Sequence, residues 1–225
     1  MKLLDEKDLI WSDVVANCRM NRKRQLIGIN SYQKDIGFDV VRYLDVLLET
    51  NTTIYWVDLC CGEGNALIQA NEVFSQPKYG GKIKMEGIDL VDMFNSHPSS
   101  TILTLKTLSL IDWQPDKKYD LITCVHGLHY VGDKLLVIAK TLEALKPNGY
   151  FITNIDLDNI RDKNDKSLKA KILKKFKVQY DSRKKLLSCK GYQKVKISWE
   201  YLGANDWVGK NYTGQEVVHS VYRGV

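Results

Sequence analysis

The sequence predicts an α/β fold built on a mostly parallel, doubly wound sheet. Short apolar runs with β character alternate with helical patterns between residues 54 and 155. Strands that are separated by helices pair in parallel through right-handed crossovers, which gives this type of sheet. The 225 residues contain no internal repeat and no linker long enough to separate two domains. We therefore expect one domain spanning 1–225.

The parts of this domain follow in order along the chain. Residues 1–50 have helical character and are expected to form an N-terminal cap or lid. Residues 51–155 are expected to form the core, with helices at Gly64–Phe74 and Lys134–Leu145. The second helix ends at Lys146-Pro147-Asn148-Gly149, where proline and glycine stop a helix. The expected strands are Ile54–Leu59, Ile83–Ile88, Ile102–Leu105, Tyr119–Val125 and Tyr150–Ile155.

Two further segments follow the fifth strand. Residues 156–190 are expected to form a basic helical insertion, because apolar residues recur there at helical spacing. These residues are Leu168, Ile172, Leu173 and Phe176. Residues 191–225 contain two β-rich runs, Val195–Leu202 and Glu216–Arg223, with no helical pattern between them. We expect these runs to form an antiparallel C-terminal pair.

Composition excludes several classes of protein. With 44% apolar and 27% charged residues, the chain resembles neither a disordered nor a low-complexity protein. No apolar run approaches the roughly 18–20 residues of a membrane span, and the acidic, broken N-terminus is unlike a signal peptide. The five cysteines form no Cys-x-x-Cys pair, which favours reduced thiols and no metal site. We expect a cytoplasmic protein without a membrane partner.

The formal charge of +6 is concentrated in one segment. Residues 156–190 carry twelve basic residues and five aspartates, so the rest of the chain is nearly neutral. A solvated helix face is the ordinary explanation of such lysines. The alternative is an electropositive rim that attracts an acidic acceptor, an acidic carrier protein or RNA.

The strongest motif is Val57-Asp58-Leu59-Cys60-Cys61-Gly62-Glu63-Gly64-Asn65, a strand that runs into a Gly-x-Gly turn and a helix. Glycines allow close approach of a ligand to the backbone, and the helix N-terminus offers free N–H groups. A tight turn without a ligand is the alternative. Asp89 then ends the second strand, where a carboxylate can accept hydrogen bonds from both hydroxyls of a ribose. The turns Leu108–Trp113 and Cys124–Gly127 follow the next two strands, so all four turns open at one edge of the sheet.

This order of motifs resembles the class I S-adenosylmethionine-dependent methyltransferases, of the bacterial small-molecule type. Their first turn reads acid-x-Gly-x-Gly-x-Gly; Asp58, Gly62 and Gly64 match, and Cys60 stands at the first glycine position. A nicotinamide-binding turn is disfavoured, because it would need glycine at Leu67. The resemblance implies a seven-stranded Rossmann-like sheet, with 51–155 as the cofactor-binding core.

The resemblance also implies a cofactor, S-adenosylmethionine, with S-adenosylhomocysteine as product, and roles for individual residues. Asp58 would organise the turn and approach the methionine amino group, Gly62 and Gly64 would pass beside the adenosyl group, and Asp89 would hold the ribose. Ser109 and the Leu110 N–H would contact the adenine, with Asp112 as the competing candidate. Trp113 would either cover the adenine or pack in the core. The remaining expected cofactor residues are Cys60, Leu90 and Val125.

The acceptor is the open question. A sulfonium methyl group is already activated, so proximity and in-line orientation supply most of the catalysis for an O, N or C nucleophile. A base is needed only if the acceptor must lose a proton. His126 and His129 follow the fourth strand and are the candidate catalytic bases, the alternative being satisfied structural histidines. The candidate acceptor-binding residues are Tyr32, Tyr130 and Trp207, although Tyr32 also fits a buried packing position.

Three functions are therefore weighed. Methylation of a small molecule by a monomer or homodimer is favoured. An RNA (tRNA or rRNA) methyltransferase using the basic segment 156–190 is the first alternative. The Asn/Asp-Pro-Pro-aromatic motif of base-directed amino methylation is absent, since Cys124-Val125-His126-Gly127 stands in its place. A nucleic acid or acidic carrier protein is thus not the favoured partner. A non-catalytic S-adenosylmethionine-binding protein is the second alternative.

Overall fold

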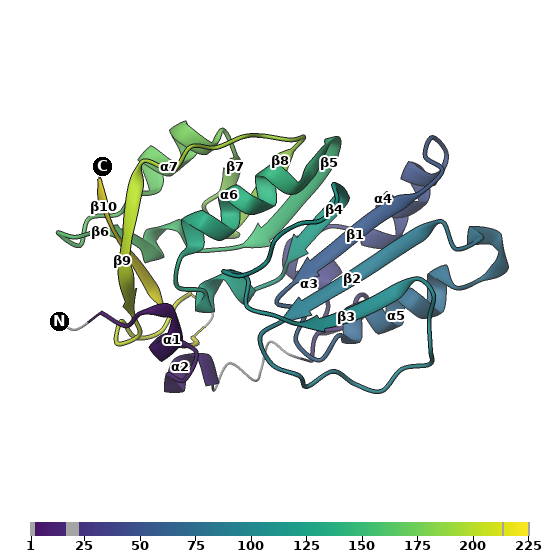
Figure 1. Cartoon of the computed structure of the whole chain (residues 1–225), viewed down its shortest axis with the longest axis horizontal. Coiled ribbons are helices and arrows are strands. Elements are labelled where there is room, and N and C mark those ends of the chain that lie inside the picture. The colour runs from purple at the N-terminus through teal and green to yellow at the C-terminus, as the bar shows by residue number, and fades with distance from the viewer. Residues whose placement is uncertain (1–2, 17–22, 213, 225) are drawn as a thin grey trace.

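The computed structural model describes residues 3–16, 23–212 and 214–224 (Figure 1). Its centre is a seven-stranded sheet with the order β3-β2-β1-β4-β5-β8-β7. The first five of these strands pair in parallel, and β8 is antiparallel to both of its neighbours. The strands are β1 (Ile54–Leu59), β2 (Ile83–Asp89), β3 (Leu103–Thr107), β4 (Tyr119–Cys124), β5 (Leu145–Asn154), β7 (Gln179–Asp181) and β8 (Leu186–Lys190). The predicted fold class and the five core strands are confirmed.

Helices cover both faces of this sheet, as the doubly wound prediction requires. The helices α4 (Val40–Leu48) and α5 (Asn65–Phe74) pack in one apolar cluster with one side of β1 and β2. The helices α6 (Lys134–Ala144) and α7 (Lys169–Phe176) pack in the other cluster. Because β1 is covered on both sides, its side chains are buried almost continuously, which is typical of a central parallel strand.

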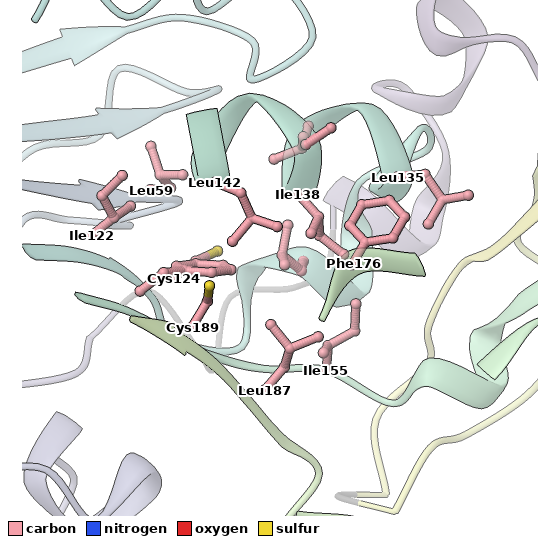
Figure 2. Packing of buried hydrophobic residues seen from close by; sticks show 14 of the residues in the cluster. Leu59, Ile122, Cys124, Leu135, Ile138, Leu142, Ile155, Phe176, Leu187 and Cys189 are labelled. Carbon is pink, nitrogen blue, oxygen red and sulfur yellow. The ribbon is translucent and has the colours of Figure 1, made fainter. Parts of the chain in front are cut away.

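Figure 2 shows the second of these clusters, where Leu142 of α6 is directed towards Cys124 at the end of β4. Leu187 and Cys189 of β8 complete the cluster from the far side of β5. The predicted apolar face of the basic segment also lies here, since Ile172 and Phe176 of α7 are fully buried. The packing of α7 therefore follows from the helical spacing that the sequence displays.

Residues 156–190 are more than a helical insertion, however. They contain α7 as predicted, but also β6 (Ile160–Asp162), β7 and β8, which the sequence analysis missed. The last two strands complete the main sheet. They were missed because they are short and flanked by exposed lysines, so alternation of buried and exposed positions extends over only a few residues.

The predicted C-terminal pair is also present. The strands β9 (Trp199–Asn205) and β10 (His219–Gly224) are antiparallel, with a bulge after Val221. They do not extend the main sheet: β10 pairs in parallel with β6, which makes a separate three-stranded sheet with the order β6-β10-β9. The N-terminus joins this second sheet, because Leu4 exchanges two backbone hydrogen bonds of 2.8 Å with Ala204 of β9.

The N-terminal region is helical, as predicted, but only part of it lies over the carboxyl edge of the sheet. It contains α1 (Glu6–Leu9), α2 (Asp13–Ala16), α3 (Tyr32–Ile36) and α4. The last of these covers a face of the sheet and is part of the core. Short 3-10 helices are η2 (Pro77–Tyr79), η3 (Gly127–Tyr130) and η4 (Leu157–Asn159). None of the helices in the described ranges is both long enough and apolar enough to cross a membrane.

Candidate functional site

A cleft opens at the carboxyl edge of the main sheet, where the turns after β1 to β4 meet α1 and α2. Its empty volume, including the mouth, is about 900 Å³. The residues predicted to bind a cofactor that line the cleft are Cys60, Gly62, Asp89, Leu90, Ser109, Leu110 and Val125. Four turns far apart in the sequence therefore meet at one place, as their position after parallel strands predicts.

The turn after β1 places three alternate residues in the left-handed region. Their φ values are 55° at Cys60, 61° at Gly62 and 77° at Gly64, which caps α5. Cys60 thus takes a conformation that favours glycine, at the position where the motif has one. Gly127 in the turn after β4 packs against it, because a Cβ built on Gly127 would lie 2.1 Å from the Cβ of Cys60. The two turns are in direct contact.

Asp89 at the end of β2 is held by the backbone of two turns. The Gly62 N–H donates to one carboxylate oxygen at 2.8 Å, and the Val91 N–H donates to the other at 3.1 Å. The side chain lines the cleft. The two backbone hydrogen bonds therefore fix the orientation of this carboxylate at the cleft.

Asp58 is buried below the cleft and does not line it. One carboxylate oxygen accepts a hydrogen bond from the Thr123 hydroxyl at 2.6 Å, and the other accepts from the Tyr32 hydroxyl at 2.6 Å. The Trp56 indole N–H donates to Thr123 at 2.9 Å and extends the network. Burial raises the pKa of Asp58 to about 7, against the lowering effect of its two hydrogen bonds. Asp58 therefore joins the end of β1 to Thr123 of β4 below the cleft, and Tyr32 contacts this acid instead of the cleft.

The turn after β3 forms the apolar part of the cleft wall. Leu108, Ser109, Leu110 and Ile111 line it. Ser109 lines the cleft and Asp112 does not. Trp113 is buried in the core beside Tyr119, with their ring centroids 6.3 Å apart, which identifies it as a packing residue.

The turn after β4 brings the two candidate histidines together. His126 has a left-handed φ of 62°, and its Nε2 lies 3.7 Å from a carboxylate oxygen of Asp35 in α3. The rings of His126 and His129 stack with centroids 6.1 Å apart. His129 is buried, and burial lowers its pKa to about 3, so its ring is neutral at physiological pH. Neither ring lines the cleft, although Val125 and Gly127 on either side of His126 do.

The three candidate acceptor-binding residues have different surroundings. Tyr130 lines the cleft and donates a hydrogen bond to Gln215 at 2.8 Å. Tyr32 is buried on Asp58, as described above. Trp207 is 90% exposed on the loop between β9 and β10 and does not line the cleft. The tail loop instead reaches the site through Tyr212, whose ring packs edge-on against His129 at 5.8 Å.

The N-terminal helices supply cleft residues that the sequence analysis missed. Glu6 of α1 lines the cleft and accepts a hydrogen bond from the Asp133 N–H at 2.6 Å. The other cleft residues of this region are Leu9, Ile10, Val15 and Ala16. The apolar residues around positions 9–15 were the available signal, but helices of four residues are too short to show a helical period.

Four of the five cysteines lie in the described part of the chain. Cys60, Cys61, Cys124 and Cys189 are free thiols, whereas Cys18 lies outside the described residues. Burial raises the pKa of Cys61, which makes its thiol unreactive. In the described part of the chain, no three His, Cys, Asp or Glu side chains are grouped to hold a metal ion.

A family model described as "Methyltransferase domain" matches residues 32–201. The curated proteins give no match. Among solved structures, 360 chains match.

Three of the matching structures are methyltransferases, each 14% identical to this chain. The N-methyltransferase NodS from Bradyrhizobium japonicum WM9, in complex with S-adenosylhomocysteine, is 14% identical; the match covers 75% of this chain and 95% of NodS, with a TM-score of 0.40. CalS10, an amino pentose methyltransferase from Micromonospora echinaspora, is 14% identical over 64% of this chain and 56% of its own, with a TM-score of 0.41. A putative S-adenosylmethionine-dependent methyltransferase from Listeria monocytogenes is 14% identical over 82% and 78%, with a TM-score of 0.39.

The family match spans the whole cleft side of the main sheet. It includes the turn after β1, the acid at the end of β2 and the turn after β4. The chain therefore belongs to the methyltransferase-domain family and is a class I S-adenosylmethionine-dependent methyltransferase.

Proposed function

We propose that the protein transfers a methyl group from S-adenosylmethionine to an O, N or C nucleophile of a small-molecule acceptor. The observation that carries the proposal is the shared cleft, in which the glycine turn, Asp89 and the turn after β3 form one wall. These are the positions at which the sequence predicts donor contacts.

The residues of the cleft fit such a donor. The Asp89 carboxylate is fixed by Gly62 and Val91 and suits the two ribose hydroxyls. Leu90 and Leu110 offer apolar surface for the adenine ring, with Ser109 beside them. When bound, the sulfonium compound would supply an activated methyl group. The protein's own part is then to bind, orient and exclude water.

Exclusion of water is assigned to the N-terminal helices. Glu6 and Leu9 of α1 and Val15 of α2 line the cleft opposite the sheet turns. The Glu6–Asp133 hydrogen bond attaches α1 to the segment after η3. A cleft that α1 and α2 cover in this way suits a small acceptor better than a large polymer.

Of the two candidate bases, we prefer His126. Its Nε2 lies 3.7 Å from a carboxylate oxygen of Asp35, whereas burial lowers the pKa of His129 to about 3 and makes its ring a weak base. We assign His126 to proton removal and His129 to packing against the His126 ring.

The basic segment gives little support to a nucleic-acid acceptor. Part of its charge is used in ion pairs within the segment, with N–O distances of 2.9 Å for Lys185–Asp156 and 3.6 Å for Lys169–Asp158. The remaining lysines of α7, such as Lys171 and Lys174, are exposed and fit a solvated helix face. A small-molecule acceptor therefore remains the proposal.

Calorimetry with S-adenosylmethionine and S-adenosylhomocysteine tests the donor site. Both should bind the wild-type protein, and Asp89→Asn should weaken both at least about tenfold, because the ribose acceptor and the Gly62 contact are disturbed together. Asp92→Asn, an exposed change in the same loop, is the matched control and should bind normally. Absence of binding to either compound by the wild type would refute the proposal. A radiolabelled methyl-transfer screen would then search for the acceptor.

A further inference from the structure

Glu6 of α1 brings a carboxylate to the wall of the cleft. Its Oε1 accepts a hydrogen bond from the Asp133 N–H at 2.6 Å. A Cβ built on Gly132 would clash with the same oxygen, so glycine at this position allows the carboxylate to lie against the backbone. The connection between η3 and α6 therefore fixes the Glu6 carboxylate at one end of the cleft.

The Glu6 end of the cleft lies away from the expected adenine position. In the sheet order β3-β2-β1-β4, the turns assigned to the adenine follow β2 and β3, on one side of β1. Asp133 follows β4, on the other side of β1. Tyr130 and Val131 belong to the same connection and line the cleft. We therefore assign the Glu6 end to the acceptor and the opposite end to the adenosyl group of the donor.

The charged side chains in the described lining of the cleft are both acids, Glu6 and Asp89. Asp89 is held by two backbone N–H groups and is assigned to the ribose. No ion pair within the described part of the chain includes Glu6. The described side chains thus give the acceptor end of the cleft a negative charge without a cationic partner.

Lys134 at the start of α6 interacts electrostatically with Glu6 but forms no ion pair with it. Its Nζ donates to the carbonyl oxygens of Val131 and Val218 at 2.7 and 2.8 Å and to the Ser220 hydroxyl at 3.0 Å. These three bonds use every N–H of an ammonium group. Burial raises the pKa of Glu6, because its charge is poorly solvated at the cleft wall. A cationic ligand would relieve this cost.

We propose that Glu6 determines the specificity for the acceptor, and that the acceptor is an apolar amine that binds as an ammonium ion and is methylated on nitrogen. The inference rests on the proposed function and deepens it by naming the class of substrate. Leu9, Ile10 and Val131 supply apolar surface for the body of the acceptor. An ammonium group forms a charge-assisted hydrogen bond with Glu6, which is stronger than the bond of a hydroxyl group. An acidic acceptor is repelled by Glu6 and Asp89.

The transfer step balances without a further reactant. The bound ammonium group first loses one proton, which ends in the solvent, and this leaves a lone pair on nitrogen. The nitrogen then forms a bond to the methyl carbon, while the carbon–sulfur bond breaks and its electron pair stays on sulfur. The products are a methylated ammonium ion and the neutral thioether S-adenosylhomocysteine. Positive charge thus moves from sulfur to nitrogen, where the Glu6 carboxylate stabilises it.

The first arm of the test asks whether Glu6 contacts the donor, whose sulfonium group is also cationic. Glu6→Gln keeps an oxygen for the Asp133 N–H and removes the charge. Calorimetry should show that this variant binds S-adenosylmethionine and S-adenosylhomocysteine within about twofold of the wild type. Weaker binding of S-adenosylmethionine alone, or of both compounds, would place Glu6 at the donor and overturn the inference. Absence of binding by the wild type would instead refute the proposed function, so the two failures are distinguishable.

The second arm measures the binding of two probes of equal size, phenethylamine and phenethyl alcohol, to the S-adenosylhomocysteine complex. The wild type should bind the amine at least about tenfold more tightly than the alcohol, and Glu6→Gln should bind the two equally. Asp8→Asn, an exposed carboxylate change on the same helix, is the matched control and should keep the preference. The inference would be overturned if the wild type bound both probes equally, preferred the alcohol or bound neither, or if Glu6→Gln still preferred the amine.

Discussion

The Tyr32 hydroxyl donates a 2.6 Å hydrogen bond to Asp58 and so joins α3 to the carboxyl end of β1. Both side chains are buried, and each was expected from the sequence to contact a ligand. In the structure each side chain is the hydrogen-bond partner of the other. This contact also sets the position of α3, which carries Asp35 towards His126.

Removal of this hydroxyl should destabilise the protein. Tyr32→Phe leaves a buried carboxylate oxygen without its donor and should lower the free energy of unfolding by about 1–3 kcal/mol. Tyr43→Phe is the control, because the Tyr43 hydroxyl is only half-buried and lies 3.5 Å from its acceptor. Urea denaturation of both variants measures the difference, and equal effects would contradict the importance of the Tyr32–Asp58 bond.

Asp58 should make stability depend on pH. Its folded-state pKa of about 7 is above the ordinary value of 3.8, so the folded state holds a proton that the unfolded state has released. The resulting stability is complete below about pH 4 and is lost as pH rises to about 7, at up to about 1.4 kcal/mol per pH unit. Asp58→Asn should therefore gain stability relative to the wild type between pH 5 and pH 8. Melting temperatures at these two pH values test this expectation, which a constant difference would contradict.

His129 should contribute a slope of opposite sign at lower pH. Its folded-state pKa of about 3 lies below the ordinary 6.5, so the unfolded state binds a proton first as the solution is acidified. Stability from this residue is complete above pH 6.5 and declines as pH falls towards 3. In His129→Gln the free energy of unfolding should therefore fall less steeply as pH decreases. The difference in slope should correspond to about one bound proton per molecule. His97→Gln, at a half-buried histidine, is the control.

The contact between the first and fourth turns should not tolerate a methyl group. In Gly127→Ala the new Cβ would lie 2.1 Å from the Cβ of Cys60 and 2.7 Å from its sulfur. We expect a loss of about 2–3 kcal/mol in the free energy of unfolding and weaker binding of S-adenosylhomocysteine, since Cys60 lines the cleft. Gly224→Ala has no atom within 4 Å of the added carbon and is the control. Similar losses in both variants would show that the contact is unimportant.

The parts of the structure that could be predicted are those with local signals. The central strands are continuous apolar runs, and the glycine turn and Asp89 have a fixed spacing, so fold class and cleft wall follow from short stretches of sequence. The strands β7 and β8 could not be predicted, because Leu187 and Cys189 become buried only through pairing with β5. A short edge strand has too few alternating positions to reveal itself.

Prediction of the candidate site from the sequence was limited in the same way. His126 was found because it follows a strand end, but its partner Asp35 lies on α3 and the two meet only through tertiary packing. No local pattern connects them. Trp207 was expected near the acceptor from the aromatic composition of the tail, and composition does not reveal exposure.

The exchange of hydrogen bonds between Leu4 and Ala204 couples the two ends of the chain to the cleft. The α1 helix that follows Leu4 lines the cleft, and β9, which carries Ala204, pairs with the last strand. Linkage of free energies is reciprocal, so a ligand that stabilises α1 also stabilises the pairing of Leu4 with β9. Protection of the C-terminal strands from a protease therefore becomes a reporter of occupancy at the cleft.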